Sequence, residues 1–180
     1  SAVLLPERFR GLRLRRLAQC SANSLPHDGA HLTIRGGAGQ GSVTIVQMTP
    51  SRSRFLDVRG LRYHLREWGV EGAPKIFLLH GWMDVSASFQ FIVDELQADW
   101  HVIAPDWRGF GLTEWHGDSY WFPDYFADLD AILRALVPDG QVSLIGHSMG
   151  GNVACHYAGV RPARVARLIA LDAFGLAESD

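Results

Sequence analysis

A serine between two glycines is the residue of this sequence best placed to do chemistry. The segment GHSMG at 146–150 matches G-x-S-x-G, and it joins an apolar run at 141–148 to a helical pattern at 149–160. A sharp strand-to-helix turn is costly for the backbone at Ser148, and side chains at Gly146 and Gly150 would collide with that turn. The turn exposes the hydroxyl at a helix N-terminus, where negative charge is favoured. The pattern therefore predicts that Ser148 is a nucleophile.

Two further segments lie at the carboxyl ends of predicted strands. HGW at 80–82 follows the apolar run 75–79, and DWRGFG occupies 106–111. With GHSMG, they resemble the α/β-hydrolase fold family, in which an HG-x segment follows the third strand and a D-x-R-G-x-G segment follows the fourth. The resemblance covers roughly residues 54–177. Thr113 stands where the family usually has serine, which is a mild departure.

The resemblance implies a role for each segment. The backbone N–H groups of Trp82 and Met149 would form the oxyanion hole that receives the charge of a tetrahedral intermediate. His80 and Asp106 would be structural, each shaping the loop that follows its strand. A serine at position 148 argues against the dehalogenase and epoxide hydrolase branches of the family, which have aspartate there.

A serine nucleophile also needs a general base and a carboxylate that orients the base. In this family both follow the serine along the chain. The only later histidine, His156, lies about two helical turns along the next helix, and the later acids are Asp172, Glu178 and Asp180. Asp172, at the end of the last strand, is a candidate acid. We expect the rest of the triad beyond residue 180, so that this chain is a C-terminally truncated, inactive part of the enzyme.

Alternating strands and helices predict an α/β fold with a mostly parallel, doubly wound sheet. The predicted strands are 55–60 and 61–69 as a hairpin, then 75–81, 101–106, 141–148 and 165–173. The predicted helices are 86–97, one beginning at Pro123 with the apolar face Phe126, Leu129, Leu133 and Leu136, and 149–160. They correspond to about strands 1–6 of the family's eight. The strand at 165–173 then has an unpaired edge, which favours aggregation.

Composition divides the chain near residue 50. Residues 1–50 hold six Arg, Glu7 and Asp28, whereas residues 51–180 hold 11 Lys+Arg and 17 Asp+Glu. We expect 1–50 to be a disordered or non-native extension, with an authentic start at Met48, and 51–180 to be the N-terminal part of a hydrolase domain. The acidic body offers no basic face for nucleic acid. No apolar run is long enough to span a membrane, and a cytoplasmic location is the default.

The predicted function is that of a serine hydrolase acting on small-molecule carboxylic esters or related acyl substrates, without metal or cofactor. An aromatic loop could wall an apolar pocket or pack against the sheet; it comprises Trp115, Tyr120, Trp121, Phe122 and Tyr125. The alternative function is a non-catalytic protein of the same fold that binds a small molecule. A histidine after an eighth strand would favour the enzyme. Oligomeric state is open.

Overall fold

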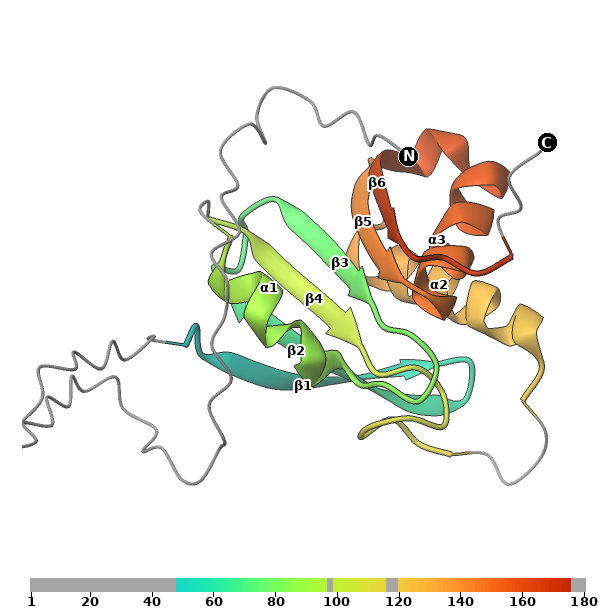
Figure 1. Cartoon of the computed structure of the whole chain (residues 1–180), viewed down its shortest axis with the longest axis horizontal. Helices are drawn as coiled ribbons and strands as arrows, with labels where there is room; N and C mark the ends of the chain where they lie inside the picture. Colours follow the sequence, from blue (N-terminus) through green and yellow to red (C-terminus); the bar gives the residue numbers. More distant parts are fainter. Residues whose placement is uncertain (1–47, 97–98, 116–119, 176–180) are drawn as a thin grey trace, which may run out of the picture. The chain divides into compact units, whose positions relative to one another are not determined.

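The computed structural model describes residues 48–96, 99–115 and 120–175, which form one mostly parallel six-stranded sheet with helices on both faces (Figure 1). Our expectations for residues 1–47, Glu178 and Asp180 lie outside the described residues.

The sheet begins with the predicted hairpin, made of β1 (Ser51–Val58) and antiparallel β2 (Leu61–Gly69). The two turn residues both have positive φ, 49° at Arg59 and 83° at Gly60. Such a pair matches the twist of a two-residue hairpin, and glycine adopts this conformation without steric cost. Strand β1 starts several residues before the predicted one.

Four further strands complete the sheet: β3 (Lys75–Leu79), β4 (His101–Pro105), β5 (Val142–His147) and β6 (Val165–Leu171). The strand order is β1-β2-β4-β3-β5-β6, and the pairs β4–β3, β3–β5 and β5–β6 are parallel. The predicted fold class is confirmed. Because the carboxyl ends of parallel strands share one rim, the segments after β3, β4, β5 and β6 come together there.

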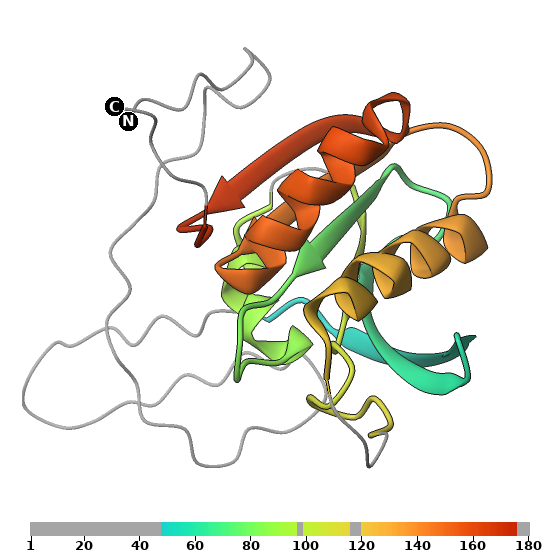
Figure 2. The same cartoon turned by 90° about the vertical axis from the view of Figure 1, so that its right-hand side faces the viewer.

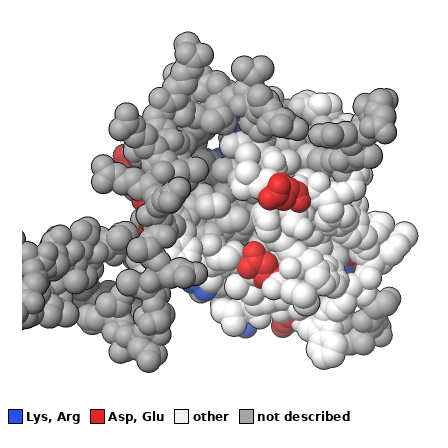
Figure 3. Space-filling view, in the orientation of Figure 1, with Lys and Arg blue, Asp and Glu red and all other residues white. Residues whose placement is uncertain are grey.

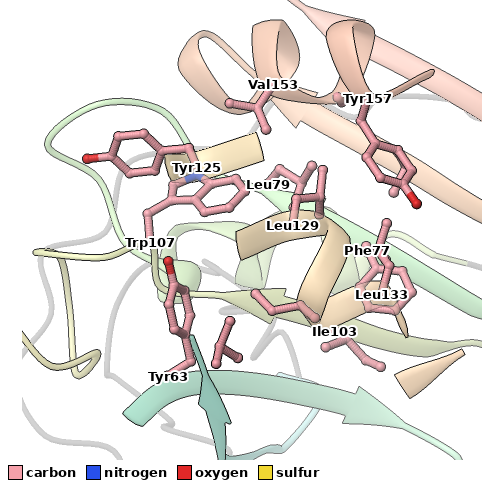
Figure 4. Packing of buried hydrophobic residues seen from close by; sticks show 14 of the residues in the cluster. Tyr63, Phe77, Leu79, Ile103, Trp107, Tyr125, Leu129, Leu133, Val153 and Tyr157 are labelled. Atoms are coloured by element: carbon pink, nitrogen blue, oxygen red, sulfur yellow. The ribbon is translucent and has the colours of Figure 1, made fainter. Parts of the chain in front are cut away.

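Side chains of the central strands alternate between the two faces of the sheet. In β3, Phe77 and Leu79 join one buried cluster, whereas Ile76 and Leu78 join the other. The first cluster packs under α2 (Phe122–Leu136) and α3 (Met149–Val160), which lie side by side over that face (Figure 2). Figure 4 shows side chains of this cluster from β3, α2 and α3 facing one another, among them Phe77, Leu79, Leu129, Leu133, Val153 and Tyr157.

The observed α-helix within 86–97 is much shorter than the predicted one. The structure has a 3₁₀ helix, η2 (Ser86–Phe89), followed by the single-turn helix α1 (Gln90–Asp94). Its end tightens into i→i+3 bonds, because Glu95 and Leu96 donate to the carbonyls of Ile92 and Val93. The apolar spacing of this segment was compatible with a longer helix, but only Phe89 and Val93 of the predicted face are buried.

The buried face of α2 is rotated from the predicted one. Tyr125, Asp128, Leu129, Ile132 and Leu133 are buried, whereas Phe126 and Leu136 are only partly buried. The rotation follows from Asp128, which is fully buried because arginine and tyrosine side chains surround its carboxylate. An apolar pattern cannot anticipate a buried charge.

Strand β6 is the edge of the sheet, as expected. It pairs with β5 alone among the described residues, and its side chains are half-buried or exposed. Such an edge is a template for pairing with another chain. The predicted aggregation stays a prediction.

The described surface in the orientation of Figure 1 is largely uncharged, with acidic groups near its middle (Figure 3). Among the described helices, none is long and apolar enough to cross a membrane.

Candidate active site

Ser148 lies at an abrupt junction between β5 and α3. Its backbone has φ 51° and ψ −115°, which is neither helical nor extended. A positive φ is uncommon for a residue with a side chain and costs of the order of 1–3 kcal/mol, so the surroundings must impose it. The N–H of Ser148 donates to the carbonyl of Leu171 at 2.9 Å, and its carbonyl accepts from the N–H of Asn152 at 3.0 Å. These contacts to β6 and α3 fix both sides of the residue.

The flanking glycines allow backbone segments to approach closely. A Cβ on Gly146 would lie 2.4 Å from the carbonyl oxygen of Gly150. A Cβ on Gly150 would lie 2.1 Å from the carbonyl oxygen of Leu79 and 2.7 Å from that of His80. The first glycine lets α3 fold back on β5, and the second lets α3 press against the end of β3.

The segment after β3 therefore reaches the serine. A Cβ on Gly81 would lie 3.2 Å from Cβ of Ser148 and 3.2 Å from Nδ1 of the exposed His147. The N–H groups of Trp82 and Met149 donate to no acceptor within the described part of the chain. Unpaired N–H groups beside a serine could receive an anionic oxygen.

His80 connects this segment to the loop after β4. Its Nε2 accepts from the backbone N–H of Trp107 at 2.9 Å, so the ring proton resides on Nδ1, which donates to the carbonyl of Gly81 at 2.7 Å. The indole N–H of Trp107 returns a bond to the carbonyl of His80 at 2.9 Å. Burial lowers the pKa of His80 and outweighs the raising effects of the Gly81 carbonyl and of Asp106 and Asp84. With both ring nitrogens engaged, His80 is structural in this structure.

The carboxylate of Asp106 is also occupied by structural contacts. It accepts from the N–H of Ser86 at 2.6 Å and of Leu112 at 2.9 Å, and it contacts Nδ1 of His64 at 2.7 Å. Burial raises its pKa, but these hydrogen bonds outweigh burial and lower the pKa below the ordinary value. The carbonyl of Asp106 accepts from Thr113 Oγ1, so threonine at this place keeps a hydroxyl in the turn.

A buried ion pair connects the loop after β4 to α2. Arg108 binds Asp128 through Nε at 2.5 Å and Nη2 at 2.8 Å, and Tyr63 donates its hydroxyl to the same carboxylate. Arg59 of the hairpin turn adds a bond at 2.9 Å. Burial, together with the charge of Asp128, raises the pKa of Tyr63, so the phenol stays protonated. Sequence reasoning missed Asp128, because it lies outside the predicted apolar face of its helix.

Comparison with known proteins places this geometry in a family. The sequence profile described as the alpha/beta hydrolase fold matches residues 74–179.

The chain belongs to the α/β hydrolase fold family.

Curated relatives carry hydrolase names. A serine hydrolase-like protein of Danio rerio is 39% identical over 110 residues, covering 60% of this chain and 33% of that protein. Epoxide hydrolase 4 of Mus musculus is 34% identical over 115 residues, covering 63% of this chain and 32% of that protein. The chain thus spans about a third of the length of these two relatives.

Solved structures of hydrolases share the arrangement. The thioesterase domain from the curacin biosynthetic pathway superposes with a TM-score of 0.67 at 30% identity, covering 73% of this chain and 49% of that one. A haloalkane dehalogenase variant from Bradyrhizobium elkanii gives 0.62 at 30% identity, covering 67% of this chain and 40% of that one. These similarities support a hydrolase in general terms.

Other candidate residues of this hydrolase-fold chain are placed as follows. His156 bonds the carbonyl of Asn152 through Nδ1 at 2.9 Å, and its ring lies 5.3 Å from that of Phe126, so its contacts lie within the helical layer. Asp172 directly follows β6 with φ 45° and is exposed. Its role as the acid stays a prediction. Among the described residues, no three His, Cys, Asp or Glu side chains converge as metal ligands.

The aromatic loop divides between packing and exposure. Tyr125 is buried against Trp107, with ring centroids 5.8 Å apart, and Phe122 packs on Phe174 at 5.8 Å. Trp115 and Trp121 are each 70% exposed. The loop therefore contributes both to the core and to the surface beside the rim.

Proposed function

We propose that Ser148 is the nucleophile of a hydrolase that cleaves carboxylic esters or related acyl substrates. The observation that carries this proposal is the backbone of Ser148, held at φ 51° with Gly81 packed against its Cβ. A strained conformation that the surroundings impose is typical of functional sites.

In the proposed reaction, Ser148 Oγ attacks the acyl carbonyl and loses its proton to a base. The C–O bond to the leaving alcohol breaks, and that alcohol takes the proton. The N–H groups of Trp82 and Met149 receive the oxyanion, each being worth roughly 10²–10³ in rate. Water then hydrolyses the acyl-enzyme. We expect the base and its carboxylate in the rest of the protein.

A serine also favours acyl substrates over epoxides for a chemical reason. Attack by serine on an epoxide would leave an alkyl ether on the enzyme, which water does not readily cleave. Attack on an ester leaves an acyl ester, which water does cleave. The likeness to epoxide hydrolase 4 therefore supports the fold and hydrolysis, and not that substrate.

A fluorophosphonate probe tests the assignment, because it reacts covalently with activated serines. In the full-length protein, the probe should label Ser148, and Ser148→Ala should abolish that label together with turnover of an aryl ester. The matched control is Ser88→Ala, since Ser88 is exposed and bonds Asp84 at 3.0 Å. Its label and turnover should match those of the parent. A label that survives Ser148→Ala at the same rate would reject Ser148 as the nucleophile.

The non-catalytic alternative makes a different prediction for the same protein. A binding protein would hold small molecules with Ser148 present or substituted, and it would show no turnover and no covalent adduct. Turnover in the parent that depends on Ser148 rejects that alternative.

A further inference from the structure

A second serine in this chain contacts a histidine that in turn contacts an aspartate. Ser53 Oγ lies 2.8 Å from Nε2 of His64, and Nδ1 of His64 lies 2.7 Å from Oδ2 of Asp106. This chain of contacts is the arrangement by which a serine hydroxyl is activated: a base within hydrogen-bond reach, itself oriented by a carboxylate. None of the three residues was assigned a nucleophilic or base role from the sequence.

The hydrogen bonds around Asp106 determine which ring nitrogen of His64 carries the proton. His64 is fully buried and Asp106 is 2% exposed, while Ser53 is exposed to solvent. The N–H groups of Ser86 and Leu112 hold the Asp106 carboxylate and keep it ionised. An ionised carboxylate at Nδ1 accepts the proton of that nitrogen. With that proton on Nδ1, Nε2 presents its lone pair to the hydroxyl of Ser53.

Phe55 and Arg66 lie on the same face of the hairpin as Ser53. Phe55 stands opposite His64 in the strand register, with ring centroids 5.3 Å apart, and is 41% exposed. Arg66 stands opposite Ser53, and its buried Nε has no hydrogen-bond partner among the described residues. The Arg66 guanidinium is directed along the strand, where its Nη1 donates to Ser51 Oγ at 2.9 Å. An aryl group can contact the exposed part of the Phe55 ring.

We propose that Ser53, His64 and Asp106 form a second nucleophilic site, distinct from Ser148, that accepts acyl groups from activated aryl esters. Ser53 Oγ forms a bond to the acyl carbon, and its proton passes to Nε2 of His64. The bond from the acyl carbon to the aryl oxygen breaks, and the aryloxide leaves with that proton. The product is acyl-Ser53 and a phenol. This inference does not depend on the proposed function of Ser148.

The site can be tested in the full chain carrying Ser148→Ala, with p-nitrophenyl acetate as the acyl donor. Peptide mass spectrometry then gives the rate of acetylation at each serine. Ser51 is an internal control: it lies on the same strand and face, but its Oγ accepts from Arg66 at 2.9 Å and contacts no imidazole of the described residues. General-base assistance is worth roughly 10²–10⁴ in rate, so Ser53 should react about a hundredfold faster than Ser51. Equal rates, or no acetyl on Ser53, would overturn the proposal.

His64→Asn separates activation from exposure. The Asn amide can still donate toward Asp106, but nothing replaces Nε2. Acetylation of Ser53 should fall to the rate of Ser51 in protein whose circular dichroism and unfolding curve match the parent. A folded His64→Asn variant that keeps the fast rate at Ser53 would also overturn the proposal. If the variant does not fold, the ratio of Ser53 to Ser51 in the parent decides.

Discussion

The backbone N–H of Trp107 donates to Nε2 of His80 at 2.9 Å, and this bond ties the end of β4 to the segment beside Ser148. It also determines where the ring proton lies, because an accepting Nε2 leaves Nδ1 to hold the carbonyl of Gly81 at 2.7 Å. In a trans peptide the carbonyl and the following N–H point in opposite directions. The orientation of the Trp82 N–H is therefore fixed by His80.

His80→Gln should reduce the pH dependence of stability. Burial lowers the pKa of His80 below 6.5, so the unfolded chain binds the proton more readily. The stability from neutral His80 is fully present above pH 6.5 and is lost as the pH falls toward the folded-state pKa. Glutamine does not titrate, and losing the bond to Gly81 costs about 0.5–1.5 kcal/mol at neutral pH.

Urea unfolding from about pH 7.5 down to about pH 5 measures this effect, because the slope of unfolding free energy against pH counts the protons bound on unfolding. The parent should lose stability more steeply than His80→Gln over that range. Identical slopes would mean that His80 is protonated equally in both states.

Gly150→Ala should destabilise the fold by about 1–3 kcal/mol, because overpacking displaces rigid neighbours. The new Cβ would lie 2.1 Å from the carbonyl oxygen of Leu79, which belongs to the backbone of a strand and cannot rotate away. Gly159→Ala in the same helix is the matched control, since a Cβ there meets nothing within 4 Å. It should stabilise by about 0.5–1 kcal/mol, because alanine favours a helix over glycine. Denaturant melts of both variants distinguish a crowded position from an open one; equal effects would contradict the close approach of α3 and β3.

Asp128→Asn should cost about 3–5 kcal/mol in unfolding free energy, since removing one charge leaves the buried Arg108 with only its longer contact to Asp124 at 3.4 Å. Asp130→Asn is the matched control two residues along α2. Asp130 is 27% exposed and pairs with the exposed Arg134 four residues later. Exposed pairs contribute at most about 1 kcal/mol, so the control should differ little from the parent. A small effect at Asp128 would show that the ion pair is dispensable for the loop after β4.

Ala166→Lys should reduce self-association of the chain. Ala166 is exposed on β6, the edge strand, and a lysine there opposes pairing with another sheet edge. Val160→Lys is the control: Val160 is 75% exposed at the end of α3 and adds the same charge away from the edge. Sedimentation across a concentration series should show less association for Ala166→Lys only. Equal reduction by both variants would point to net charge rather than the edge.

The order of strands and helices could be predicted from the sequence because it depends on local patterns. The apolar run before Gly146, the glycine spacing and the helical pattern after Ser148 are all contiguous, and β5 and α3 formed within a residue or two of their predicted bounds. The hairpin turn at Gly60 and the strands before HGW and DWRGFG were likewise predicted from contiguous residues. Periodicity did not place the short helix α1, because its length depends on which side chains the sheet buries.

Only the tertiary structure decided which polar groups meet. His64 and Asp106 are 42 residues apart, and Tyr63 and Asp128 are 65 apart. Their contacts depend on β4 lying beside β2 and on the rotation of α2. The sequence by itself determined a serine on a strand-to-helix turn. Only the sheet determined that another hydroxyl, on Ser53, faces an imidazole, because strand register depends on two segments that are apart in the sequence.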